Sequence, residues 1–418
     1  RAEENRLTSG VAGIKRTTGQ HPGGIVVIPK EYEIYDFTPV QHPADDNTSN
    51  VITTHFAFEF LHDTLLKLDI LGHDVPTEYK LLQDYTGIDV RTVPTNDTRV
   101  MKLFTSTEPL GVSPDDIFSS IGTFGMPECG TSYVRQMMEA AKPKCFSDLL
   151  QISGLSHGTG IWLGNGEELI KAGTCTISEI IGTRDSIMLY LSNKGVENGL
   201  AFKIMESVRK GKGLKPEWEA EMRNNNVPEW YIDSCKKIKY MFPKAHAAAY
   251  IISALRLGWY KVYYPLEFYA AFFTVAPGGF DGVAALKGKA ALKEIISEIE
   301  NKADKSQKED EQYSACQLAL EAVCRGIKFL PVSLEHSDSH AFLPENGKIR
   351  LPFSCLPGLG DTAAVKIAEA CKGTKIFSVE ELSQKAKISK AVIEILQQNG
   401  VLDGLSETNQ ISMFSFMD

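Results

Sequence analysis

One acidic residue stands inside an apolar run of the sequence. Asp69 lies within Leu65-Leu-Lys-Leu-Asp-Ile-Leu-Gly72. A charged side chain is rarely buried without a partner, so this carboxylate either pairs with a base or binds a cation. Lys67 lies two residues away on the same strand face and supplies a base. The residues alone leave both interpretations open.

A second group of residues joins positive charge to aromatic rings. Residues 200–246 hold ten Lys or Arg and six Asp or Glu, in a chain whose formal net charge is −9. Within them, Tyr240 and His246 alternate with Lys239 and Lys244. Cations beside aromatic side chains suit a triphosphate and a stacked base. A charge run is also typical of a solvated helix face, so composition leaves that alternative open.

A glycine hairpin is the clearest short motif. In Leu356-Pro-Gly-Leu-Gly360 two glycines flank an apolar residue, and a helical pattern follows to Ile367. This is the helix-hairpin-helix pattern, in which the glycines allow a tight turn and backbone N–H groups face a phosphate at the helix N-terminus. Such contacts position DNA without reading its sequence. The alternative is an ordinary helical hairpin. A degenerate copy over 382–405 lacks the glycine turn, which predicts a scaffold.

The last residues form a compact apolar set behind a polar segment. Gln410, Ile411, Met413 and Phe414 follow the polar residues 406–409. A terminal segment without a core of its own has little reason to expose such side chains unless a partner's pocket receives them. Docking on its own domain is the alternative. The run Gln410-Ile-Ser-Met-Phe414 resembles the pentapeptide that binds sliding clamps.

The elements that carry these motifs change along the chain. Residues 1–72 predict strands and loops, with buried strands at Ile25–Ile28 and Leu65–Leu71, and a helix begins at Val75. Residues 96–270 are predicted to be mostly helical, and residues 325–352 to be short strands and turns. The individual helices predicted after residue 200 are Ala201–Arg209, Trp230–Tyr240, Ala247–Tyr264 and Ala284–Gln317, followed by small helices in the last 70 residues.

Length and composition exclude several classes of protein. The 418 residues suggest two to four domains, and 43% apolar with 23% charged residues excludes collagen-like, coiled-coil and fully disordered chains. No apolar run reaches the ~18 residues of a membrane span. The negative net charge argues against binding nucleic acid by bulk charge, although a local basic face remains compatible with it. The eight cysteines form no CxxC pair, which favours reduced thiols in a cytoplasmic protein.

Several long segments together resemble the bacterial C-family replicative DNA polymerases, most closely the alpha subunit of DNA polymerase III of the PolC type. The palm-like segments are Lys15–Val27, Thr53–Phe56 and Leu65–Gly72, and the fingers-like segments are Ala201–Lys212 and Lys237–Tyr250. The resemblance covers essentially the whole chain in order. It implies a mixed α/β, mostly α fold with a polymerase-beta-like nucleotidyltransferase palm, helical fingers and tandem helix-hairpin-helix units.

The same resemblance implies a domain order. Residues 1–95 would be the C-terminal part of the palm, 96–275 the fingers, 276–350 a duplex-binding region, 351–405 the tandem hairpins and 406–418 the clamp-binding tail. The chain begins with Arg1 rather than Met and enters a motif almost at once, which suggests the C-terminal portion of a longer polymerase.

The implied activity is template-directed nucleotidyl transfer with two magnesium ions. Asp69 matches the third of the family's three metal-binding aspartates, whereas the Asp-x-Asp pair that supplies the first two is absent from this chain. The isolated chain is therefore expected to be inactive. The implied nucleotide-binding residues are Arg184, Lys203, Arg209, Tyr240, Lys244 and His246. The implied DNA-binding residues are Lys15, Arg16, His21, Gly358 and Gly360.

The implied partners are primer–template DNA, deoxynucleoside triphosphates, a sliding clamp bound by Gln410–Phe414 and other replisome subunits, without a membrane. A non-catalytic module that binds DNA and tethers the clamp is the alternative. A helix-hairpin-helix repair enzyme, such as a glycosylase or ligase, is disfavoured because Cys371-Lys372-Gly373 follows the hairpin helix with no suitable acid nearby.

Overall fold

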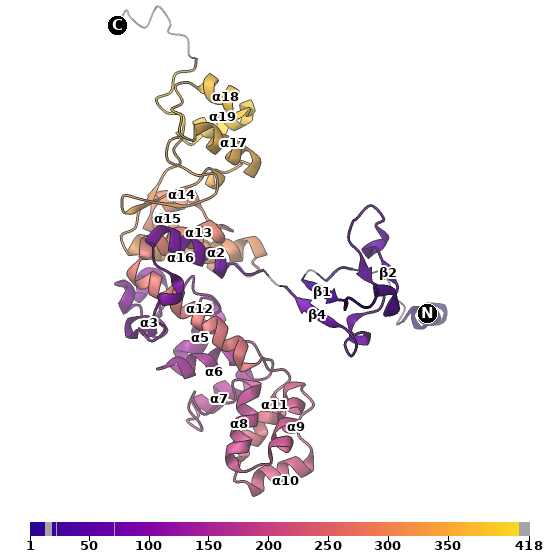
Figure 1. The fold of residues 1–418 in the computed structure, drawn as a ribbon. Helices are drawn as coiled ribbons and strands as arrows, with labels where there is room; N and C mark the ends of the chain where they lie inside the picture. Colours follow the sequence, from indigo (N-terminus) through magenta and orange to yellow (C-terminus); the bar gives the residue numbers. More distant parts are fainter. Residues whose placement is uncertain (13–18, 22, 71, 409–418) are drawn as a thin grey trace, which may run out of the picture. The chain divides into compact units, whose positions relative to one another are not determined.

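The computed structural model of the chain describes residues 1–12, 19–21, 23–70 and 72–408. The chain divides into two compact units, Arg1–His73 and Asp74–Asp418 (Figure 1). The segment 74–95, predicted to continue the palm, lies in the second unit. There its helix packs on a helix formed by residues 265–275.

The described part of the first unit holds one α-helix, three short 3-10 helices and two small antiparallel ribbons. Strand β1 pairs with β4, with Gly24 opposite Asp69, and β2 pairs with β3. The elements are α1 (Ala2–Val11), β1 (Gly24–Val27), β2 (Val40–Gln41), β3 (Thr53–Thr54) and β4 (Leu66–Asp69). Helix α1 corrects the prediction of strands and loops here. Its acidic first turn favours a helix, as does the ion pair between Glu3 and Arg6, whose Oε1 and Nη2 atoms lie 2.6 Å apart.

The prediction that the two longer strands are buried is wrong. Ile25 is 54% exposed and its cross-strand partner Leu68 is 46% exposed. Successive side chains of a strand point to opposite faces, so Val27 and Leu66 share this open face while Lys67 lies on the other. A ribbon of only two strands has too few neighbouring elements to bury both of its faces. The apolar runs therefore indicated strands correctly but not their burial.

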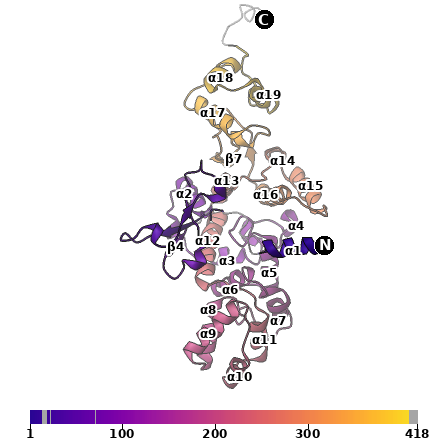
Figure 2. The ribbon, with the colours of Figure 1, turned by 90° about the vertical axis from the view of Figure 1, so that its right-hand side faces the viewer.

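The second unit is mostly helical (Figures 1 and 2). A small sheet has the order β5-β7-β6, with β5 parallel and β6 antiparallel to β7. Its strands are β5 (Phe329–Leu330), β6 (Leu343–Glu345) and β7 (Lys348–Arg350). Its first helices are α2 (Val75–Thr86), α3 (Thr98–Lys102), α4 (Pro114–Ile117), α5 (Ser132–Ala141), α6 (Phe146–Ser156), α7 (Glu167–Lys171), α8 (Arg184–Lys194), α9 (Asn198–Arg209), α10 (Pro216–Asn224) and α11 (Glu229–Lys237). The later helices are α12 (Lys244–Tyr263), α13 (Pro265–Val275), α14 (Gly282–Lys287), α15 (Lys289–Glu300), α16 (Gln307–Cys324), α17 (Asp361–Cys371), α18 (Val379–Ala386) and α19 (Lys390–Gln398).

Most predicted helices are present, with shifted ends. Helix α2 begins at Val75 with Pro76 in its first turn, as predicted. The single helix predicted over Ala284–Gln317 is wrong, because three helices occupy the region. Gly288, with a φ of +88°, separates α14 from α15, and a capping box between Ser306 and Glu309 starts α16 anew. No helix among the described residues is long and apolar enough to cross a membrane.

Helix α12 connects two hydrophobic cores. It packs against α2, α3, α6, α8 and α13. Leu257 and Tyr260 belong to the core formed with α2, α13–α19, β5 and β7, whereas Ile251, Ala254 and Leu255 belong to the core formed with α3 and α5–α11. Because both cores depend on this one helix, its position sets how the two helical groups meet.

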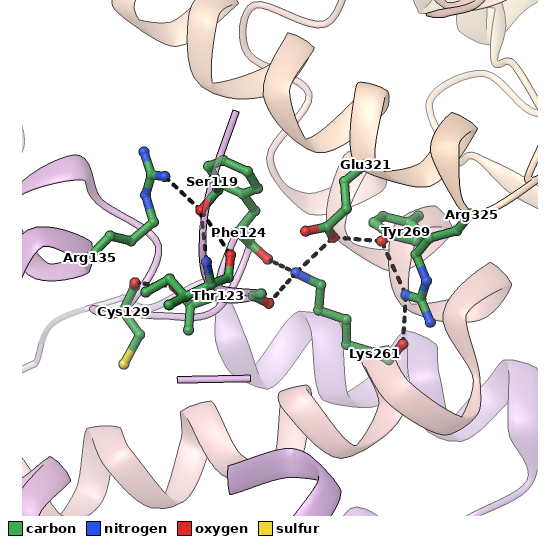
Figure 3. Close-up of polar contacts among 11 residues, drawn as sticks. Ser119, Thr123, Phe124, Cys129, Arg135, Lys261, Tyr269, Glu321 and Arg325 are labelled. Carbon is green, nitrogen blue, oxygen red and sulfur yellow. Dashed lines mark hydrogen bonds and ion pairs between the residues drawn. The ribbon is translucent and has the colours of Figure 1, made fainter. Parts of the chain in front are cut away.

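A buried ion pair fixes α12 in this place (Figure 3). The Lys261 Nζ lies 2.7 Å from Glu321 Oε1 on α16, and both side chains are fully buried. The ammonium also donates to the carbonyls of Gly122 and Phe124, at 2.8 and 2.6 Å. Tyr269 donates its hydroxyl to the same Glu321 oxygen at 2.6 Å. Burial lowers the pKa of Lys261 to about 8, and the attraction of Glu321 opposes that shift.

We expect Glu321→Gln to destabilise the protein strongly, because it leaves the Lys261 charge buried without a counter-charge. Breaking a buried pair on one side costs about 3–5 kcal/mol of unfolding free energy. The double variant Lys261→Met/Glu321→Leu removes both charges and should recover much of that loss. Urea unfolding followed by circular dichroism measures both.

The control is Lys289→Ala, which breaks an ion pair with Asp116 whose two side chains are 46% and 39% exposed. Exposed pairs contribute little, so this variant should unfold near the parent midpoint. Equal midpoints for Glu321→Gln and Lys289→Ala would contradict the importance of the buried pair.

Candidate nucleotide and nucleic-acid interface

The starts of α8 and α12 are joined by two hydrogen bonds. The backbone N–H of Arg184 donates to the carbonyl of Phe242 at 3.2 Å. The Asp185 carboxylate accepts from the backbone N–H of Lys244 at 2.7 Å. This carboxylate satisfies one of the N–H groups that a helix start leaves without an intrahelical partner. As a result, the predicted residues Arg184 and Lys244 lie at neighbouring helix starts.

Glycines bring the basic loop after α9 against the segment that carries Tyr240. A Cβ atom on Gly211, whose φ is +68°, would lie 2.5 Å from the Lys239 carbonyl oxygen. On the other side, Thr159 exchanges backbone hydrogen bonds with this segment, accepting from Lys239 and donating to Tyr240 at 2.8 and 3.0 Å. Arg209 ends α9 two residues before Gly211, so this close approach brings the end of α9 against the segment of Tyr240. Tyr240 itself is 44% exposed.

Arg209 is already engaged by a carboxylate. Its Nε and Nη2 atoms each donate to Glu206 at 2.9 Å, one to each carboxylate oxygen. Lys210 lies 3.2 Å from the same carboxylate. The hydrogen bonds from Arg209 lower the pKa of Glu206 to about 2, so the acid stays ionised. A phosphate offers the same kind of acceptor, so a triphosphate must share or displace Glu206.

Lys203, another predicted fingers residue, lies on a different side of α9 from Arg209. It is exposed on α9, six residues before Arg209. At 3.6 residues per turn it points about 120° away from Arg209 around the helix axis. The similarity of its segment to polymerase fingers did not predict the direction in which the Lys203 side chain points.

An aromatic and histidine cluster lies beneath the exposed Tyr240. The ring of Tyr240 meets Phe242 edge-on at 5.5 Å, and Phe242 stacks on His246 with ring centres 4.8 Å apart. His157, from the end of α6, contacts His246 at 5.1 Å. Burial, and secondarily the charge of His157, lowers the pKa of His246.

Sequence reasoning missed Asp185, Phe242 and His157, along with Glu128, the ion-pair partner of His157. Each lies in or beside a glycine-rich or proline-containing segment without helical spacing, and only the tertiary structure brings them together. The sole signal in the sequence was the adjacency of Asp185 to Arg184 and of Phe242 to Tyr240 and Lys244.

In the first unit, Asp69 is paired with a base. Its Oδ1 lies 3.2 Å from Lys67 Nζ, with Asp69 49% and Lys67 26% exposed. Of the two interpretations of Asp69, a pair with a base or a bound cation, the structure contains the pair with Lys67. Magnesium takes several oxygen ligands, and no group of three His, Cys, Asp or Glu residues among the described residues could hold a metal ion. The described residues by themselves therefore do not fit a magnesium site.

Lys67 also faces a hollow of about 710 Å³ within this unit. His21 lines the same hollow and accepts a hydrogen bond from the Gly23 N–H through Nδ1 at 3.1 Å. A Cβ on Gly24 would lie 2.9 Å from that nitrogen, so glycine lets the histidine fold back on β1. Lys15 and Arg16, the other predicted palm contacts, lie outside the described residues.

The glycine hairpin forms as predicted. Gly358 adopts a φ of +83°, Leu359 is buried, and Gly360 ends an exposed turn from which α17 begins. A Cβ on Gly360 would meet no atom within 4 Å, so the turn is open to a ligand. The degenerate hairpin joins α18 to α19 through Lys387, whose φ is +50°. Ile395 of α19 lies 3.5 Å from the Cβ position of Gly358, so the second hairpin supports the first.

The predicted clamp contacts Gln410, Ile411, Met413 and Phe414 lie outside the described residues.

Three regions of the chain match families of known proteins. Residues 2–72 match the family described as "Bacterial DNA polymerase III alpha NTPase domain". Residues 76–226 match "Bacterial DNA polymerase III alpha subunit finger domain", and residues 326–411 match "Helix-hairpin-helix motif". The first two matches meet near the boundary between the compact units at His73.

Whole-chain similarity extends over the same regions. The chain is 53% identical to the proteins named "DNA polymerase III PolC-type" of Bacillus cereus and Bacillus subtilis, over 99% of its own length and 29% of theirs. It is 50% identical to the protein of that name from Thermotoga maritima, over 30% of that protein. The chain thus spans less than a third of the length of these relatives.

Proposed function

Because this chain belongs to the family of PolC-type DNA polymerases III, we propose that it supplies the fingers, part of the palm and a duplex-binding region to template-directed nucleotidyl transfer. The observation that carries the proposal is that Arg184 and Arg209, from the region that matches the polymerase finger domain, meet the segment with Tyr240 and Lys244 that follows this region. Three cations beside an exposed aromatic ring suit an incoming deoxynucleoside triphosphate.

Each residue then has a distinct role in binding. Arg184, Arg209 and Lys244 would neutralise the triphosphate, and Tyr240 would stack near the new base pair, with His246 packed behind it. Glu206 would leave Arg209 as the phosphates arrive, since carboxylate and phosphate compete for one guanidinium fork. Gly358 and Gly360 would let backbone N–H groups approach the phosphates of primer–template DNA.

Asp69 would supply one carboxylate to magnesium in such an active site. The metal would stabilise charge on the transferred phosphoryl group. The further ligands would have to come from outside the described residues, so no step is assigned through the metal. We extend the proposal to a sliding clamp bound by Gln410–Phe414, to other replisome subunits as partners and to a cytoplasmic location.

We expect Arg184→Ala and Arg209→Ala, made in an active polymerase that contains this sequence, to raise the KM for nucleotide by roughly 10- to 100-fold each. Each change removes a charge-assisted contact to phosphate. Steady-state primer extension at varied nucleotide concentration measures the effect. Arg223→Ala is the control, since Arg223 is held by Glu219 and Glu229 and has no proposed role. Weaker duplex binding with unchanged nucleotide KM would instead identify a surface for the DNA backbone.

We expect Asp69→Asn in the same polymerase to lower kcat by about a hundredfold or more, because a group that stabilises transition-state charge is lost. DNA affinity, measured by fluorescence anisotropy, should stay nearly constant. Lys67→Gln is the matched control, since it removes the same ion pair but leaves the carboxylate. Normal turnover by Asp69→Asn would assign the residue a structural role in the ribbon.

We expect alanine at Gln410, Met413 and Phe414 to abolish binding of the sliding clamp and to shorten the DNA copied per binding event. A tethered peptide raises local concentration on DNA without changing the active site. Basal synthesis without clamp should therefore be unchanged. The measurement is a titration of clamp with the parent and triple-alanine C-terminal peptides. Equal affinities would rule out this segment as the attachment point.

A further inference from the structure

The loop of residues 118–131 is held by hydrogen bonds to Lys261 and by one within the loop itself (Figure 3). Lys261 binds the carbonyls of Gly122 and Phe124, while Thr123 donates its hydroxyl to the carbonyl of Cys129 at 2.8 Å. Between them, Glu128 adopts a φ of +63°, which is uncommon for a residue other than glycine. A strained conformation of this kind persists where the surroundings over-determine it, and such positions gather at functional sites.

The side chain of Glu128 reaches out of this loop to His157. Its Oε2 lies 3.0 Å from His157 Nε2, and both side chains are partly buried, with His157 18% and Glu128 31% exposed. On the other side of the ring, His157 Nδ1 lies 2.7 Å from the carbonyl oxygen of Ser153, which can only accept. The Ser156 hydroxyl also lies 3.0 Å from Nδ1, but it donates to the same Ser153 carbonyl, so both ring nitrogens face acceptors, which favours the imidazolium. The hydrogen bond that His157 donates to the Glu128 carboxylate raises the pKa of His157 accordingly.

His157 in turn contacts the segment that carries the nucleotide site. Its ring lies 5.2 Å from Phe242 and 5.1 Å from His246, edge-on to both. Two residues later, Thr159 pairs through its backbone with Tyr240. The His246 Nε2 atom is buried and has no hydrogen-bond partner among the described residues. The His246 ring is therefore held by packing between His157, Phe242 and Tyr250, whose ring centre lies 4.5 Å away.

We propose that Glu128 and His157 are positioning residues of the nucleotide site, which hold Phe242 and His246 and so set the orientation of Tyr240. The inference rests on the proposed function. The groups whose charge acts within this cluster are Glu128 from the loop, His157 from the end of α6 and His246 from α12. Loss of the His157 proton removes the positive charge that attracts Glu128 and leaves one ring N–H for two acceptors, Glu128 and the Ser153 carbonyl, which loosens the hold on the ring.

The His157 imidazolium is the form that Glu128 holds, so the contact weakens as the pH rises. The pKa of His157 is raised above 6.5 in the folded protein, so the contact is complete below that pH and is lost as the pH rises through the raised value. In an active polymerase that contains this sequence, the KM for nucleotide should therefore rise on the alkaline side. Glu128→Gln should move this rise to lower pH and increase the KM at neutral pH about 3- to 10-fold.

The variant His157→Gln distinguishes a pH-dependent positioning role of His157 from a general contribution to stability. A glutamine amide can donate to Glu128 but does not titrate in this range, so its KM should be nearly independent of pH. Glu219→Gln is the control, since it removes a partly buried carboxylate that pairs with Arg223 and Lys236 outside the cluster. Superimposable pH profiles of KM for the parent, Glu128→Gln and His157→Gln would overturn the proposal.

A second measurement does not require activity. Long-range ¹H–¹⁵N spectra of the 418-residue chain should show one histidine that titrates at raised pH, is absent in His157→Gln and shifts to lower pH in Glu128→Gln. If Glu128→Gln leaves that titration unchanged, the positioning role fails whatever the polymerase does. Arg184→Ala and Arg209→Ala could leave the nucleotide KM unchanged while the histidine titration behaves as expected. The proposed nucleotide site would then be wrong, and the contact between Glu128 and His157 would have a structural role only.

Discussion

The arrangement of the helical unit depends on the buried ion pair between Lys261 and Glu321. Neither charge reaches water, so each must be satisfied by the other and by the hydrogen bonds around them. This requirement ties α12 to α16 and to the loop at Gly122–Phe124 in one geometry. Since α12 also supplies side chains to both hydrophobic cores, the pair fixes how the two groups of helices meet.

The candidate nucleotide site is built largely from close backbone approaches. Gly158, Gly160 and Gly211 each leave no room for a Cβ beside the segment 237–240. Because these glycines have no Cβ atom, the two loops that contain them lie directly on that segment. The cations are then set by helix ends that those loops hold, rather than by a regular spacing along one helix. The same loop that Lys261 anchors carries Glu128 to His157, so the core and the site share one support.

The ribbon of the first unit is held by different forces. Its apolar face, with Ile25, Val27, Leu66 and Leu68, is exposed, and its other face presents Lys67 to a hollow shared with His21. A two-stranded ribbon gains little stability by itself. The ion pair of Lys67 with Asp69 orders the end of β4 and is the interaction that a cation would have to replace at that carboxylate.

The sequence by itself determined the mostly helical class, the glycine hairpin before α17 and the segments that match bacterial DNA polymerase III alpha subunits, because periodicity, glycine pairs and long motifs are local properties. The helix that begins at Val75 was predicted correctly. The sequence predicted one helix where α14, α15 and α16 lie, because the capping box that starts α16 stands in a polar run typical of a solvated helix. Burial of the strands, the pairing of Arg209 with Glu206 and the contact of Glu128 with His157 were decided only by the tertiary structure. Each depends on which distant segments meet, and a pattern of residue types along the chain does not encode the direction in which a side chain points.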